Sequence, residues 1–69
     1  MNKQQLIKFL ERKENQMKTT PEYGQTFLSQ AFGAVDFYLA TLDNWDKEDE
    51  IINLWNLEWR PRLEAIVYG

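Results

Sequence analysis

The chain contains no cysteine and no histidine among its 69 residues. The lack of cysteine excludes disulfides and cysteine-rich zinc sites, which are the usual means of stabilising very small folds. The lack of both residue types excludes Ser-His and Cys-His catalytic mechanisms. A chain of this length buries only about 60% of the surface that its unfolded form exposes, so a single core supplies modest stability.

Long hydrophobic runs are also missing. No segment approaches the roughly 18 to 20 apolar residues of a membrane-spanning helix. Lys3 and Lys8 interrupt the region where a signal peptide needs an unbroken apolar stretch. We therefore expect one domain over residues 1–69, a cytoplasmic location and no membrane partner.

Glycine and proline are scarce, with three and two copies. The glycines are too few for a set of hairpins, and no segment alternates polar and apolar residues as a strand does. Helix-breaking residues at 19–21 and 43–46 divide the chain, which predicts an all-α fold with helices at about 3–18, 21–42 and 46–67. Short connections favour a three-helix bundle, or an α-hairpin with an added N-terminal helix.

The first two helices are predicted to be amphipathic. In the first helix, Lys13 falls inside the apolar arc. A lysine at a protein contact can lay its aliphatic stem along the apolar surface and keep its charged end in water. Thr19 or Thr20 is expected to cap the second helix, with Pro21 at its first position. The apolar arc of the first helix holds Leu6, Phe9, Leu10 and Met17, and that of the second holds Phe27, Leu28, Ala31, Phe32, Ala34, Val35, Tyr38, Leu39 and Leu42.

The third helix is predicted to be irregular. Pro61 lacks an N–H group and its ring clashes with the carbonyl of Leu57, so we expect a kink near Trp59 and Arg60. Asp46 is the expected N-cap. The core-like face of this helix holds Ile51, Ile52, Trp55, Trp59, Leu63, Ile66 and Val67.

An acidic cluster over residues 43–50 is the most obvious candidate for a metal site. Counted from Asp46, however, the sixth position is Ile51 instead of glycine and the twelfth is Leu57 instead of glutamate, so the EF-hand pattern fails. Negative charge at a helix start accounts for the cluster. We therefore expect no metal ion at these carboxylates.

Catalysis by carboxylates is also disfavoured. Asp36 and Glu58 are the candidates for a buried acid or base. Three short helices rarely enclose the few hundred cubic ångströms that a substrate needs. The sequence therefore predicts no enzymatic activity, no catalytic residue, no cofactor and no small-molecule substrate.

Charge is segregated along the chain. Residues 1–18 hold five basic and two acidic side chains, and residues 19–69 hold three basic and nine acidic ones. The basic residues point to nearly every side of the first helix and the net charge is −3, which disfavours nucleic-acid binding. Two alternatives stay open: a nucleic-acid-linked regulator that uses the first helix with Arg60 and Arg62, and an acidic DNA-mimicking inhibitor from a bacterial or phage mobile element.

The ten aromatic residues are many for so small a core. Several large apolar side chains fall outside the predicted core faces, namely Phe37, Trp45, Leu54, Leu57 and Tyr68. Aromatic side chains are enriched at interface centres because they bury a large area at low entropy cost. We therefore predict a non-enzymatic helical protein that acts through protein–protein interaction at these residues, with a homodimer favoured over a different protein partner.

Overall fold

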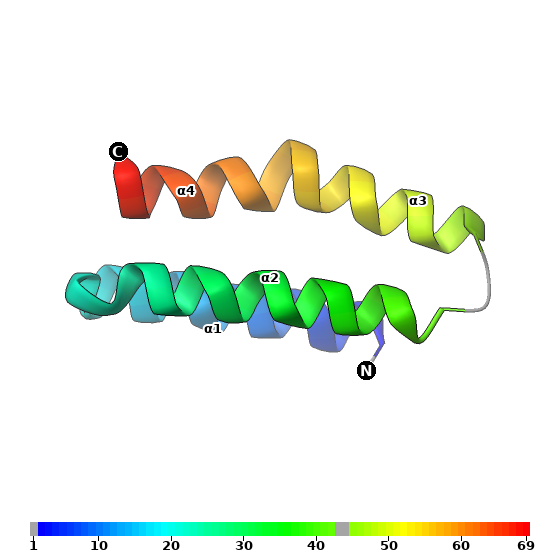
Figure 1. The fold of residues 1–69 in the computed structure, drawn as a ribbon, viewed down its shortest axis with the longest axis horizontal. Coiled ribbons are helices and arrows are strands. Elements are labelled where there is room, and N and C mark those ends of the chain that lie inside the picture. Colours follow the sequence, from blue (N-terminus) through cyan, green and yellow to red (C-terminus); the bar gives the residue numbers. More distant parts are fainter. Residues whose placement is uncertain (1, 43–44) are drawn as a thin grey trace.

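Three helices run antiparallel to their neighbours in sequence (Figure 1). This computed structural model describes the backbone of residues 2–42 and 45–69 and the side chains of residues 2–42 and 50–69. The elements are α1 (Lys3–Thr19), the short 3-10 helix η1 (Pro21–Tyr23), α2 (Gly24–Ala40), α3 (Trp45–Leu54), the π-helical turn η2 (Trp55–Trp59) and α4 (Arg60–Tyr68). No strand occurs in the described backbone, and the predicted all-α fold is confirmed.

The third helix consists of α3, η2 and α4 in one continuous run (Figure 1). It lies over both α1 and α2, and α4 packs against each of them. Because the chain crosses the molecule three times, α1 and the third helix run parallel, and the two termini lie at opposite ends (Figure 1). The molecule measures 37 × 20 × 16 Å.

The helix ends differ from the sequence prediction. Asn2 caps α1 through a capping box, in which its side chain accepts a hydrogen bond from the Gln5 N–H group at 2.8 Å and Gln5 accepts one from the Asn2 N–H group at 2.9 Å. Thr20 occupies the N-cap position before Pro21, but the side-chain cap expected of Thr19 or Thr20 is not formed. Thr19 donates its hydroxyl proton to a carbonyl of its own helix, and Thr20 makes no side-chain cap. Pro21 does begin the next helical turn, as expected.

The start of α3 also differs. The helix begins at Trp45, so Asp46 lies within α3 and is not the residue before it. The side chains of the acidic cluster other than Glu50, and with them the expected capping role, lie outside the described residues.

The buried core draws on all three helices. Phe32 lies beside it and meets the Trp55 ring edge-on, with ring centroids 5.1 Å apart. Edge-to-face contacts of this kind place the positive ring edge against the negative ring face. The buried apolar residues are Leu6, Leu10 and Met17 from α1; Leu28, Ala31, Val35 and Tyr38 from α2; and Ile51, Trp55, Trp59 and Leu63 from the third helix.

The buried residues of the third helix are spaced four apart throughout, at Ile51, Trp55, Trp59 and Leu63. At 3.6 residues per turn, this spacing would place the first and last of them about 120° apart around a regular α-helix, so they could not face one core. A π turn holds one extra residue, which reduces this offset to roughly 20°. The structure has this turn between the two tryptophans, where the Arg60 N–H group bonds to the Trp55 carbonyl five residues back.

Pro61 follows the π turn directly. It has no N–H group to offer the Leu57 carbonyl, so a regular α-helical hydrogen bond is impossible at this point. The expected irregularity near Trp59 and Arg60 is confirmed, and it takes the form of a change of helix type within a continuous helix. The four-residue spacing of the buried residues and the missing N–H group of Pro61 therefore both favour a π turn before Pro61.

This geometry predicts an unequal tolerance to deletion. Removing the exposed Asn56 in a Pro61→Ala background should give a regular α-helix with the same core face, and a melting temperature close to that of Pro61→Ala alone. Removing the exposed Ser29 from the regular α2 should rotate the residues after it by roughly 100° and unfold the chain. Thermal melting followed by circular dichroism compares the two deletions, and equal losses of stability would contradict the account of the π turn.

Candidate functional site

The buried stripe of α1 includes a carboxylate. Glu14 is 6% exposed and lies between Leu10 and Met17 on the core-facing side of the helix. Arg62 of α4 donates two hydrogen bonds to it, one from Nη2 to Oε1 at 2.8 Å and one from Nε to Oε2. The Arg62 guanidinium also lies over the Trp59 ring, 4.6 Å from its centroid. A bidentate pair of this kind fixes the position of α4 along α1.

The surroundings of Arg62 stabilise its protonated, positively charged form. Its hydrogen bonds to Glu14 raise the pKa of Arg62 above the ordinary value, and partial desolvation opposes this. The negative charges of Glu14, Glu11 and Glu58 act in the same direction as the hydrogen bonds. Arg62 is therefore a permanent cation, and its half-exposed side chain is engaged by Glu14 of the same chain.

The neighbouring Arg60 is engaged as well. Its Nε donates to Glu64 Oε1 at 2.8 Å, and its guanidinium lies 5.6 Å from the centroid of the Phe32 ring. The basic and aromatic residues around Pro61, which the sequence offered as a nucleic-acid contact, thus make contacts within the chain. The intramolecular pairing of both arginines weighs against that alternative.

Lys13, which the sequence places inside the apolar arc of the first helix, lies at the contact between α1 and α2. Its Nζ donates to Gln30 Oε1 at 2.7 Å. The ammonium group lies 5.0 Å from the centroid of the Phe9 ring and 5.4 Å from that of Phe27. These are cation–π contacts in which the aliphatic stem crosses the apolar surface and the charge reaches its edge.

The carboxylates proposed from the sequence are not the buried ones. Asp36 and Glu58 are both exposed, and Glu14 takes the buried position. The burial of Glu14 could have been predicted from its spacing, because it lies four residues after Leu10 and three before Met17 on the same helical face. No group of three potential metal ligands occurs among the described residues.

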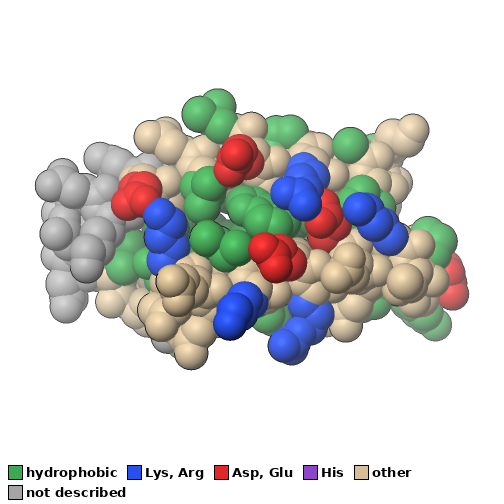
Figure 2. Space-filling model, turned by 180° about the vertical axis from the view of Figure 1, so that it is seen from behind, with side chains coloured by type: hydrophobic (Ala, Val, Ile, Leu, Met, Phe, Trp, Pro, Cys, Tyr) green, Lys and Arg blue, Asp and Glu red, His purple; other side chains and the backbone are tan. Residues whose placement is uncertain are grey.

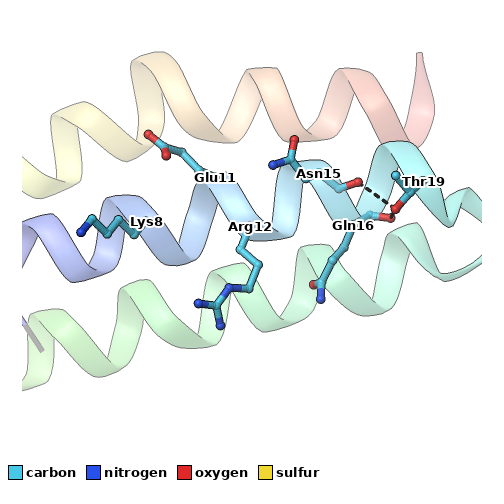
Figure 3. A pocket seen from close by; sticks show the side chains of 6 residues that line it. All are labelled: Lys8, Glu11, Arg12, Asn15, Gln16 and Thr19. Atoms are coloured by element: carbon cyan, nitrogen blue, oxygen red, sulfur yellow. Dashed lines mark hydrogen bonds between the residues drawn. The ribbon is translucent and has the colours of Figure 1, made fainter.

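The outer side of α1 carries a concave region whose lining comes from one helix alone (Figure 3). Its side chains spread apart: Arg12 and Gln16 point toward α2, and Glu11 points toward the third helix (Figure 3). Thr19 bonds to the Asn15 carbonyl. Since the polar groups do not converge on a point, this region does not resemble a substrate site.

A second concave region lies between α1 and the third helix, and we call it the Leu54–Leu57 groove. Its volume is about 270 Å³, and its exposed lining is mostly apolar. Leu57 is 77% exposed, whereas Leu54 is partly buried and packs against the core. Lys3 and Glu50 form an ion pair at the groove. The lining residues are Lys3, Glu50, Asn53, Leu54, Leu57 and Glu58.

The structure therefore brings two of the five predicted interface residues together and separates others. Phe37 is 60% exposed on α2 and does not line the groove. Tyr68 is 67% exposed near the C-terminal end of α4. The end of α4 lies near the start of α2, where Tyr23 is also exposed, a residue that the sequence prediction left out. The Trp45 side chain lies outside the described residues.

One face of the molecule exposes hydrophobic side chains in a hollow bordered by acidic and basic ones (Figure 2). This is the face on which α1 lies in front, since α1 lies behind α2 in Figure 1. The fold defines a small all-α, three-helix protein. Comparisons with protein-family models, with curated proteins and with solved structures find no significant match for this chain. None of the described helices combines the length and the apolar character needed to cross a bilayer.

The Glu14–Arg62 contact generates a stability prediction. Arg62→Leu should lower the melting temperature by roughly 10 °C or more, because it leaves the buried carboxylate without its donors. The double variant Glu14→Leu/Arg62→Leu should recover much of this loss, since it also removes the buried charge. Arg60→Leu is the matched control and should have a small effect, because its pair with Glu64 is exposed. A double variant no more stable than Arg62→Leu would contradict this account.

Proposed function

We propose that this chain is a non-enzymatic helical protein that acts by binding another protein, and that the Leu54–Leu57 groove is its contact surface. The observation that carries the proposal is the exposure of Leu57 beside Leu54 in a mostly apolar hollow between two helices. The proposal keeps the cytoplasmic location expected from the charged first helix.

The energetics of Leu57 support a binding role. Burying a leucine side chain is worth about 1.5–3 kcal/mol, and the fold gains almost none of this at position 57. A partner that covers the groove would gain it. Leu54 supplies a rigid floor because it is already packed against the core. Apolar surface rimmed by polar residues is typical of protein-binding sites.

The absence of catalytic activity remains part of the proposal. The most deeply buried described carboxylate, Glu14, is held by two hydrogen bonds from Arg62 and has no cavity beside it among the pockets described above. The groove itself presents leucine side chains and one ion pair. These features suit the capture of an apolar side chain better than acid–base chemistry.

Site-specific photocrosslinking tests the proposal. A photoreactive phenylalanine analogue at position 57 should give a covalent protein adduct when cells that make the protein are irradiated. The same analogue at Ser29, an exposed position on α2, is the matched control and should give little adduct. The absence of any protein adduct at position 57, with the folded protein present at normal levels, would reject the groove as a protein-binding surface.

A further inference from the structure

We propose that the occupant of the Leu54–Leu57 groove is a basic amphipathic helix of another protein, which covers Leu57 with an apolar side chain and places a lysine or arginine between Glu11 and Glu58. This inference rests on the proposed function, since it names the chemistry of the partner at the same surface. Three observations support it: the alignment of α1 with the third helix, two acidic side chains without partners, and the apolar surface beside them.

Two ion pairs align α1 with the third helix. Lys3 pairs with Glu50 near the start of both helices, and Glu14 pairs with Arg62 further along. The pairs join positions 47 and 48 residues apart. Because the two helices run parallel (Figure 1), each residue of α1 between these pairs is level with the residue 47 or 48 positions later in the chain.

This alignment brings two acidic side chains to the same level. Glu11 of α1 is level with Glu58 of η2, which lines the groove. Glu11 does not line the groove, but it points from α1 toward the third helix (Figure 3). The negative charges of both carboxylates raise the pKa of Arg62, so both lie close enough to act on its guanidinium. Acidic side chains accordingly border the apolar hollow on opposite sides (Figure 2).

Neither carboxylate is compensated by another side chain that the structure describes. Glu11 and Glu58 are both exposed, and neither forms an ion pair with a described residue. Arg62 lies near both, but its two hydrogen bonds go to the buried Glu14. Since the two ion pairs between α1 and the third helix are neutral in themselves, the described residues leave two negative charges uncompensated at the border of the groove.

The neighbouring cations of α1 do not supply the missing charge. Arg12 follows Glu11 in the sequence but points toward α2 (Figure 3), and Lys8 lies on the outer side of the helix. A metal ion does not fit either, because the described residues contain no group of three potential ligands. A cationic side chain of a partner fits instead, since it can pair with carboxylates on two facing helices.

The spacing of apolar and acidic residues on the third helix suits an amphipathic helix as partner. Leu54 and Glu58 are four residues apart, which places them about one helical turn, or roughly 6 Å, apart along the axis. A partner helix presents an apolar residue and a lysine or arginine at the same separation when they lie three or four residues apart. Strand addition is not available, because the described backbone contains no strand. A helix laid in the groove is therefore the fitting recognition mode.

The charge of the whole chain favours the same partner. Its net charge is −3, so long-range forces attract a basic protein and repel both nucleic acid and a second copy of the chain. The sequence prediction favoured a homodimer, but the acidic borders of the groove offer no unpaired cation to the same groove of a second copy. The outer face of α2 exposes Phe37, but Asp36 is the one charged residue of Gly24–Ala40, so a basic helix finds no pair of acids there.

Two synthetic peptides test the charge requirement. One is an amphipathic helix of leucine, alanine and lysine, and the other has glutamate in place of every lysine. Added to the full chain, the lysine peptide should shift the NMR signals of Leu54, Leu57 and Glu58, with a dissociation constant of roughly 0.1–1 mM. The glutamate peptide should bind roughly tenfold more weakly or not at all. Equal binding of the two peptides, or shifts confined to other surfaces, would overturn the inference.

A charge reversal tests which acids are responsible. Glu11→Lys/Glu58→Lys should bind the glutamate peptide better than the lysine peptide, because the border of the groove becomes basic. Its melting temperature should change little, since both positions are exposed. Glu22→Lys/Asp36→Lys is the matched control, because it makes the same change in net charge at two exposed positions elsewhere, and it should keep the wild-type preference. A control that reverses the preference as fully as the first variant would overturn the role of Glu11 and Glu58.

The crosslinking experiment at position 57 separates this inference from the proposed function. The crosslinked segment, mapped by mass spectrometry, should carry lysine or arginine beside apolar residues. An acidic segment of another protein, or a second copy of this chain, would overturn the basic helix as occupant and support the groove as a protein-binding surface. The absence of any adduct at position 57 would count against both.

Discussion

The contact between Glu14 and Arg62 sets the arrangement of the whole bundle. A carboxylate on the buried side of α1 is unfavourable on its own, because charge in a low-dielectric interior must be paired. The required cation comes from α4, which is the last helix along the chain. The same guanidinium covers the Trp59 ring, so one side chain satisfies the buried charge and closes the core. The parallel alignment of α1 with the third helix, and with it the position of the groove, depends on this pair.

The π turn is the second constraint, and it acts together with the first. Arg62 reaches Glu14 only if α4 presents the correct side to α1, while Trp55 and Ile51 must face the core about two and three turns earlier. In a regular α-helix, residues spaced four apart drift around the helix axis, so the first and the last of the buried residues could not both face the core. The extra residue in η2 corrects the rotation between them.

Hydrophobic periodicity was sufficient to predict three helices and most of the core, and the chemistry of Pro61 was sufficient to predict the irregularity before it. It was insufficient for Glu14, because a pattern of apolar residues does not register a charged side chain whose partner lies 48 positions away. The interface prediction failed to separate surfaces for a similar reason. A helix wheel shows that Phe37 and Leu57 both leave the core face, but only the packed structure shows that Leu54 and Leu57 line one groove and that Phe37 does not. The helix caps depended on single hydrogen bonds, and there Asn2 was overlooked.

The odd number of helices has a consequence for how copies of the chain can be connected. With three crossings, the N-terminus and C-terminus lie at opposite ends of the long axis (Figure 1). In two copies placed end to end along this axis, the end of one polypeptide lies beside the beginning of the next. A short peptide bridge would thus join them into a single continuous chain of six helices. A four-helix monomer, with both ends on one side, would need a bridge along the length of the molecule for the same fusion.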